Sequence, residues 1–322
     1  MTIRNILLNS ALLPDGWHEN VLIELDQHGE IVALQHDSTD ASAEKVNGFS
    51  IPAVPNVHSH AHQRAMVGLA EASGPGADSF WTWREVMYNF AGKIGPEELE
   101  AIAAQLYVET LKSGSTVMGE FQYLHHQPDG KPYDEPAEMS LRCLSAAETA
   151  GIAITILPTL YNFGGFGGRP STDGQRRFVN DAKRFLGILE TLHNVSSGHP
   201  LRQIGISPHS LRAVTKELLD DVIEGLNDFD DQAPIHIHIS EQLKEVDDCF
   251  EWSGGSRPVE LWLDRFDVTR RWCAIHATHM TDDETERLAK SGCIAGLCPT
   301  TEANLGDGTF NAVRFLDAGG AI

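Results

Sequence analysis

The sequence predicts an α/β protein, a TIM-type (β/α)8 barrel that follows a small N-terminal β-sandwich domain. Three observations support this prediction. Short apolar strands alternate with helices after residue 50, polar side chains gather directly after the strands, and histidines recur at these strand ends. Alternating strands and helices favour a parallel sheet with helices packed outside it. A (β/α)8 barrel places its chemistry at the carboxyl ends of its strands.

The first 50 residues read as short strands joined by tight turns. Ile6–Leu8, Val21–Leu25 and Ile31–Leu34 are apolar or alternating, and Pro14-Asp15-Gly16 is a turn sequence. We therefore expect residues 1–50 to be the N-terminal part of a small β domain. Residues 51–322 are expected to be the barrel.

The barrel elements are predicted from the alternation that begins at residue 51. The expected strands are 51–57, 115–121, 152–160, 203–207, 234–239, 272–277 and 292–298. The expected helices include 96–112, 136–150, 175–193, 215–227, 257–265 and 281–290. An open doubly wound sheet is the alternative, but it normally carries an early glycine-rich phosphate turn. The run Gly164–Gly168 follows the third strand and leads into Arg169-Pro170, so it is interpreted as a lid or a plain loop.

Composition limits the partners and the compartment. The chain has 322 residues and a net charge of -22, which argues against nucleic acid or an anionic membrane as a partner. No apolar run is long enough to span a membrane, and the N-terminus does not resemble a signal peptide. The five cysteines are scattered without a CxxC pair, which is typical of structural thiols in a reducing cytoplasm. We expect a cytoplasmic protein.

Histidines follow three of the expected barrel strands. His58 and His60 are two residues apart, so on a strand they point to one face and both can reach one metal ion. The segment 234–239 repeats this spacing and is followed by Glu241, and His276 comes directly after Ala274-Ile275. Such an ordered series is typical of a metal-dependent hydrolase built on a barrel.

These residues resemble the amidohydrolase superfamily, which has an HxH motif after strand one and single histidines after strands five and six. Within it, the chain is similar to the formimidoylglutamate deiminases of histidine degradation. The narrower resemblance depends on four strings: His58–Met66, Trp81–Arg84, His236–Gln242 and Thr300–Gly308.

The resemblance implies hydrolytic deimination of N-formimino-L-glutamate to N-formyl-L-glutamate and ammonia. The implied substrate is a small anion, and the implied assembly is a homodimer. The resemblance also implies one divalent metal ion, with zinc expected, and a set of residues for each role. The metal ligands would be His58, His60 and His238; the catalytic residues Glu241 and His276; and the substrate-binding residues Gln63, Arg84, Tyr123 and Arg212.

The metal would activate a water molecule, Glu241 would move a proton to the departing nitrogen, and His276 would stabilise the tetrahedral centre.

Two of these assignments rest on local arguments. His238 is preferred to His236 as the ligand because in the deaminase branch an acidic residue follows the ligand by three positions, as Glu241 does here. A mononuclear site is favoured because the fourth strand, 203–207, lacks the lysine of binuclear members. His279 is the alternative to His276. Arg84 is placed in an aromatic-rich loop at the barrel mouth.

One feature departs from the superfamily, which has an aspartate at the end of strand eight. The sequence stops at Ile322, and Asp307 and Asp317 precede the expected strand. The chain is therefore expected to be truncated within its barrel and to be weakly active or inactive alone. The alternative functions are a deaminase for guanine or an S-adenosylhomocysteine-like substrate, and a metal-binding homologue without activity. Turnover distinguishes these readings.

Overall fold

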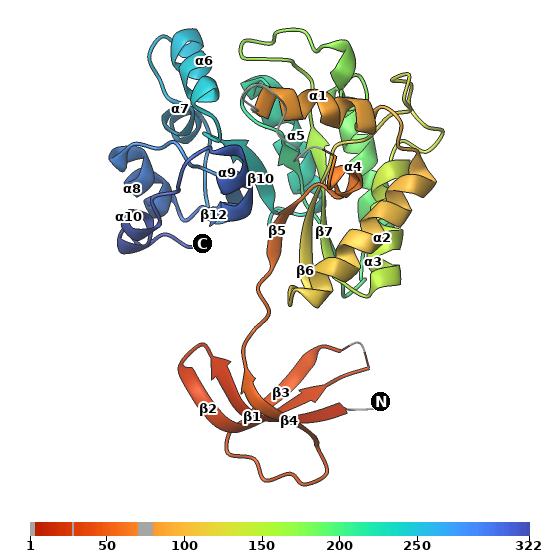
Figure 1. Ribbon diagram of the computed structural model, residues 1–322, viewed down its shortest axis with the longest axis vertical. Helices are drawn as coiled ribbons and strands as arrows, with labels where there is room; N and C mark the ends of the chain where they lie inside the picture. Colours follow the sequence, from red (N-terminus) through yellow and green to blue (C-terminus); the bar gives the residue numbers. More distant parts are fainter. Residues whose placement is uncertain (1–3, 28, 70–79) are drawn as a thin grey trace. The chain divides into compact units, whose positions relative to one another are not determined.

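The computed structural model describes residues 4–27, 29–69 and 80–322. The chain divides into two compact units, Met1–Val54 and Pro55–Ile322. Within the described residues, no helix combines the length and the apolar character that crossing a membrane requires. Each unit has its own sheet structure (Figure 1).

The N-terminal unit is a four-stranded sheet with the strand order β3-β2-β1-β4. Its strands are β1 (Arg4–Leu13), β2 (Gly16–Leu25), β3 (Ile31–Gln35) and β4 (Glu44–Ser50). The first three are antiparallel neighbours, and β4 pairs in parallel with β1. The predicted strands near the N-terminus are confirmed. The sequence analysis missed β4 because its residues are mostly polar and exposed.

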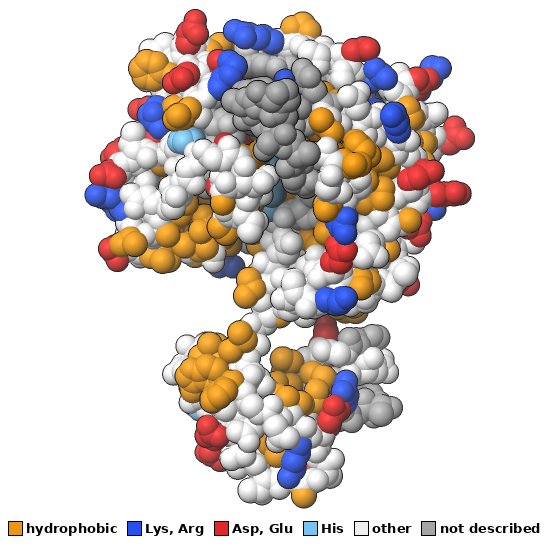
Figure 2. Space-filling view, in the orientation of Figure 1, with side chains coloured by type: hydrophobic (Ala, Val, Ile, Leu, Met, Phe, Trp, Pro, Cys, Tyr) orange, Lys and Arg blue, Asp and Glu red, His pale blue; other side chains and the backbone are white. Residues whose placement is uncertain are grey.

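Apolar side chains remain exposed on this N-terminal sheet. Among the residues that the structure describes, its buried cluster comprises Leu7, Leu22 and Ala43, whereas Trp17 is 53% exposed and Phe49 is 83% exposed. Figure 2 shows the hydrophobic side chains that gather on the surface of this unit. The described residues form one sheet here, so the predicted sandwich stays a prediction.

The second unit is built on parallel strands that follow one another in sequence order. One sheet contains β5 (Asn56–Ser59), β6 (Val117–Gln122), β7 (Ala153–Leu160), β8 (Arg202–Ile204) and β9 (Ser207–Pro208). The other contains β10 (Ile235–Ile239), β11 (Trp272–His276) and β12 (Ile294–Gly296). A parallel bridge between Ile206 and Ile235 connects the two sheets. The predicted α/β architecture with parallel strands is confirmed.

Helices lie between these strands. They are α1 (Phe80–Ala91), α2 (Pro96–Lys112), α3 (Glu138–Ala150), α4 (Ala182–Ser196), α5 (Lys216–Phe229), α6 (Leu243–Ser253), α7 (Pro258–Arg265), α8 (Asp282–Ser291), α9 (Pro299–Leu305) and α10 (Ala312–Asp317). Figure 1 shows α2 and α3 packed together beside β6 and β7. Capping hydrogen bonds explain where some of these helices begin. For example, the Thr281 side chain accepts from the Glu284 amide at the start of α8.

The central strands are buried on both faces. Every residue of β10 and β11 is buried. In β10, Ile235, Ile237 and Ile239 belong to the core that includes Trp262 of α7. Since side chains alternate along a strand, the intervening histidines face the interior of the strand array. This alternation positions His238 for the site described below.

The predicted starts of one strand and one helix in the second unit were wrong by several residues. The strand expected over 51–57 begins only at Asn56, because Pro52 and Pro55 have no amide hydrogen to donate to a ladder. The helix expected over 175–193 begins at Ala182, where Asp181 accepts a hydrogen bond from the Arg184 amide.

Candidate metal-dependent active site

A cavity of about 600 Å³ opens at the carboxyl ends of the parallel strands. The structure brings every predicted site residue to its lining. These residues are His58, His60, Gln63, Arg84, Tyr123, Arg212, His238, Glu241 and His276. These residues are far apart in the sequence, from strand β5 to strand β11. The fold of the chain therefore brings them together.

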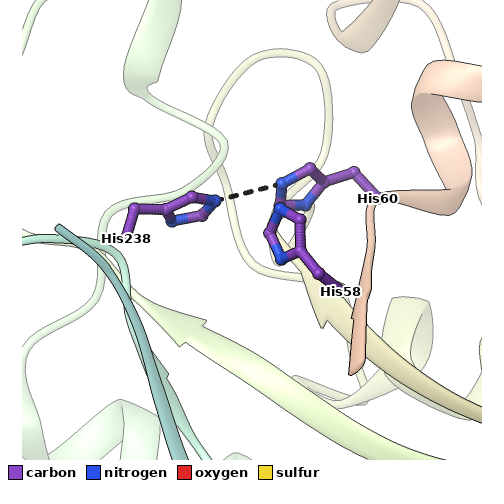
Figure 3. Close-up of side chains that lie close together, drawn as sticks. All are labelled: His58, His60 and His238. Atoms are coloured by element: carbon purple, nitrogen blue, oxygen red, sulfur yellow. Dashed lines mark hydrogen bonds between the residues drawn. The ribbon is translucent and has the colours of Figure 1, made fainter. Parts of the chain in front are cut away.

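His58, His60 and His238 point toward one another (Figure 3). Their potential ligand atoms all lie within 4.8 Å of one another. The Nδ1 atom of His60 lies 3.3 Å from the Phe121 carbonyl, and that of His238 lies 2.9 Å from the His209 carbonyl. A carbonyl accepts only, so both Nδ1 atoms donate and both Nε2 atoms carry lone pairs.

This arrangement fits a cation. The Nε2 atoms of His60 and His238 lie 3.3 Å apart, and two lone pairs facing each other at that distance are stabilised by a positive ion between them. Nδ1 of His58 is also buried without a hydrogen-bond partner. Three histidine nitrogens with a further position left open are a typical catalytic zinc arrangement.

Burial keeps these imidazoles in the neutral form that binds metals. It lowers the pKa of His60 to about 4 and lowers the pKa values of His58 and His238 well below the ordinary value. His236 is placed differently: its Nδ1 lies 3.1 Å from the Val57 carbonyl, and it does not join the cluster. The geometry thus selects His238 over His236 as the third potential ligand.

A second group of side chains surrounds His276. Its Nε2 lies 3.4 Å from Oε1 of Glu241, and its Nδ1 lies 2.9 Å from Oε1 of Glu302. Burial raises the pKa of the Glu241 carboxyl. Burial acts to lower the pKa of His276, but the charge of Glu241 and the hydrogen bonds to Cys298 and Glu302 together outweigh it, so the pKa is raised well above its ordinary value. The pair can therefore hold a proton and transfer it between the carboxyl and the imidazole.

The backbone turns sharply where these catalytic candidates leave their strands. Ser240, His276 and Ala277 have φ values of 50°, 70° and 47°, a left-handed conformation that costs energy for residues other than glycine. The Ala277 amide donates to the Ile239 carbonyl at 3.0 Å and holds one of these turns. Strain of this kind is concentrated at functional sites, and here it occurs beside Glu241 and at His276 itself.

The remaining part of the cavity carries arginines and aromatic rings. The Nε atom of Arg212 is buried without a hydrogen-bond partner, so it is available to an anionic ligand. The guanidinium of Arg84 lies 5.5 Å from the ring centre of Tyr88. The hydroxyl of Tyr123 lies 3.4 Å from Nε2 of His60, so this phenol also contacts the histidine cluster.

The placement of Arg84 in a loop was wrong. Arg84 lies on α1, and Trp83 beside it lines the cavity. The side chain of Trp81 lies outside what the structure describes. The prediction failed because this segment is rich in aromatic residues and offers no clear helix-starting signal.

Sequence reasoning missed Glu302 and His209 as site residues. Glu302 contacts His276 although the two are 26 positions apart. It lies inside the string Thr300–Gly308, but only the folded chain shows that its carboxylate reaches strand β11. His209 lines the cavity and orients His238 through its carbonyl. Its position directly after the fourth expected strand was the available signal.

Comparison with known proteins decides the family. The model of the amidohydrolase family matches residues 49–322. The chain belongs to the amidohydrolase family. The resemblance inferred from the histidine motifs is thereby confirmed.

Two similar proteins show which members of the family this amidohydrolase resembles. The formimidoylglutamate deiminase of Pseudomonas aeruginosa is 48% identical over 319 residues, which cover 98% of this chain and 69% of the relative. The crystal structure of an amidohydrolase from Brucella melitensis has a TM-score of 0.92 and 51% identity, and covers 98% of this chain and 69% of that chain. The chain thus spans about two thirds of the length of both.

A more distant structure shows the fold alone. The atrazine chlorohydrolase of Arthrobacter aurescens, solved in complex with zinc, has a TM-score of 0.78 at 19% identity. The match covers 98% of this amidohydrolase and 70% of that chain.

Proposed function

We propose that this amidohydrolase hydrolyses N-formimino-L-glutamate to N-formyl-L-glutamate and ammonia, a step of histidine degradation. The observation that carries the proposal is one cavity lined both by potential metal ligands and by arginines. The histidine cluster and the Glu241–His276 pair line it, and Arg84 and Arg212 contribute to the same lining. The similarity to the Pseudomonas aeruginosa deiminase supports this substrate over other amidines.

One divalent metal ion, with zinc as the expected ion, would be held by His58, His60 and His238. A metal ion in such a site supplies Lewis-acid activation of water at neutral pH. The chain's own contribution is to keep the three imidazoles neutral by burial and to fix their ring orientation through backbone carbonyls.

Glu241 is proposed to transfer a proton to the formimino nitrogen, so that ammonia leaves as a neutral molecule. Its raised pKa allows the carboxyl to hold a proton before the transfer. His276, close to Glu241, would stabilise negative charge as the attacked carbon becomes tetrahedral. Glu302 would hold the ring of His276 in place.

The substrate carries two carboxylates, which arginine binds well because its guanidinium forms paired, charge-assisted hydrogen bonds. Arg212 is the better supported carboxylate ligand, since its buried Nε has no partner within the described residues. Arg84, Gln63 and Tyr123 are proposed to complete substrate binding. This binding by local cations would offset the unfavourable field of a chain with a net charge of -22.

We also propose that the parallel strands belong to a closed (β/α)8 barrel. A Cβ on Gly296 of β12 would lie 3.3 Å from Cγ2 of Val57 on β5, so the first and last of these strands approach each other. Ala321 forms an isolated parallel bridge with Ile294. Residues 1–50 are proposed to form the N-terminal part of the small β domain, a sandwich, and residues 51–322 the barrel.

A homodimer and a cytoplasmic location complete the proposal. All five cysteines are free, which suits a reducing compartment. Sedimentation of the purified chain tests the dimer.

The experiment that tests the proposed reaction is ammonia release by the zinc-loaded chain. N-formimino-L-glutamate, guanine and S-adenosylhomocysteine are supplied separately, and bound zinc is measured in the same samples. We expect release from N-formimino-L-glutamate alone. Release from guanine or S-adenosylhomocysteine would instead indicate another deaminase. No release from any of them, with zinc bound, would support a homologue without activity.

A further inference from the structure

The site contains a second cluster of potential metal ligands that the proposed reaction does not use as such. His58, His276 and Cys298 offer ligand atoms that all lie within 4.8 Å of one another. His58 belongs to β5, His276 ends β11, and Cys298 directly precedes α9. The cluster shares His58 with the three-histidine cluster and differs from it in the other two members.

The donor atoms of this second cluster favour thiophilic ions. A thiolate with two imidazoles is a soft donor set, which suits Zn²⁺ and binds softer ions such as Cd²⁺ more strongly than oxygen ligands do. Two carboxylates, Glu241 and Glu302, contact His276 and add negative charge beside the cluster. The unpartnered Nδ1 of His58 shows that this ring has bonding capacity that the described protein atoms leave unused.

We propose that His58, His276 and Cys298 form a second metal position that overlaps the first through His58 and selects thiophilic ions. Binding there forms one metal–sulfur bond and two metal–nitrogen bonds. The thiol proton of Cys298 and any proton on the coordinating nitrogen of His276 pass to solvent. Both positions need His58 as a ligand. We therefore expect an ion in one position to compete with an ion in the other.

Occupation of this second position has a consequence for the proposed reaction. An ion that binds His276 withdraws it from Glu241 and removes His58 from the three-histidine cluster. Thiophilic ions are therefore inhibitors. This consequence rests on the proposed function, whereas the existence of the position does not, so the test below detects the metal–sulfur bond directly.

The test is a titration of the metal-free chain with Cd²⁺, followed by the ultraviolet charge-transfer band of a cadmium–thiolate bond and by the amount of bound cadmium. We expect the band in the unaltered chain. Cys298→Ser is expected to lose the band but still bind cadmium through the three histidines. His60→Ala is expected to keep the band, since it removes a ligand from the three-histidine cluster only.

Cys249→Ser is the matched control, because Cys249 is a buried free thiol on α6 outside both clusters. It is expected to keep the full band. Circular dichroism of each variant verifies that the fold is retained. A band of unchanged amplitude in Cys298→Ser, or cadmium bound to the unaltered chain without a band, would overturn the proposal.

Discussion

The three-histidine cluster and His276 line one cavity and differ in protonation. The rings of His238 and His276 are stacked with their centres 5.7 Å apart. Nevertheless, the pKa of His238 is lowered well below the ordinary imidazole value by burial, and the pKa of His276 is raised well above it despite burial. Identical side chains at the ends of neighbouring strands thus differ in charge, because His238 is neutral and His276 is positively charged.

The difference arises from what each ring contacts. His238 faces the His209 carbonyl and other imidazoles, so desolvation is not opposed by a negative charge. His276 lies between the carboxylates of Glu241 and Glu302. The comparison teaches that strand position brings a histidine into the site, and that neighbouring carboxylates decide whether it is a ligand or an acid–base group.

The largest effect is expected on removing a metal ligand. His238→Ala should abolish both tight zinc binding and turnover, because two imidazoles alone hold zinc poorly. His236→Ala is a matched control on the same strand, since His236 lies outside the ligand cluster. Metal analysis and ammonia release measure the two effects. Full zinc content in His238→Ala would contradict the assignment of the ligands.

Glu241→Gln is expected to lower kcat by about 10²- to 10⁴-fold, the usual contribution of a general acid or base. Zinc content should be unchanged, because Glu241 is outside the three-histidine cluster. Asp248→Asn removes an exposed carboxylate of α6 and serves as the control. A variant that retains most of its kcat would show that Glu241 has no role in proton transfer.

Glu302→Gln should reduce kcat by about 10- to 100-fold, as expected for loss of a group that orients a functional histidine. The amide also removes a negative charge beside His276, so the limb of the pH–rate profile that reports His276 should move to lower pH. A merely structural role would leave the profile in place. Glu286→Gln, on the surface of α8, is the control.

Arg212→Gln is expected to raise KM about tenfold with a smaller change in kcat, because a hydrogen bond to a charged group contributes about 1.5 kcal/mol or more. Steady-state rates with N-formimino-L-glutamate measure this split. Equal affinity in the variant and the unaltered chain would place the substrate carboxylates elsewhere.

Much of the fold was predictable because its signals are local. The helix over 96–112 was predicted at its observed bounds, since Pro96 marks its start and acidic residues occupy its first turn. The helices α6 and α1 were not predicted. No side chain caps the start of α6, although Gly254 in a left-handed conformation ends it. The strand at 51–57 was shortened by two prolines, a local signal that the apolar pattern concealed.

The site residues, too, were predictable where the signal is local and unpredictable where it depends on the folded chain. The HxH spacing placed His58 and His60 together, because strand geometry is periodic. Glu302 could not be assigned a role, since its contact with His276 depends on how the segment after β12 folds back toward β11. The different protonation of the three-histidine cluster and of His276 could not be predicted from the sequence either. Burial and carboxylate contacts, which cause it, arise only in the folded chain.

The most direct test of this account is a pH titration of the histidine side chains by ¹⁵N NMR, with His60→Ala and His276→Ala used for assignment. The account predicts that His60 stays neutral from about pH 8 to about pH 5, since burial lowers its pKa to about 4. His276 should remain doubly protonated through neutral pH. A neutral His276 at neutral pH, or a His60 that titrates near its ordinary pKa, would contradict the account.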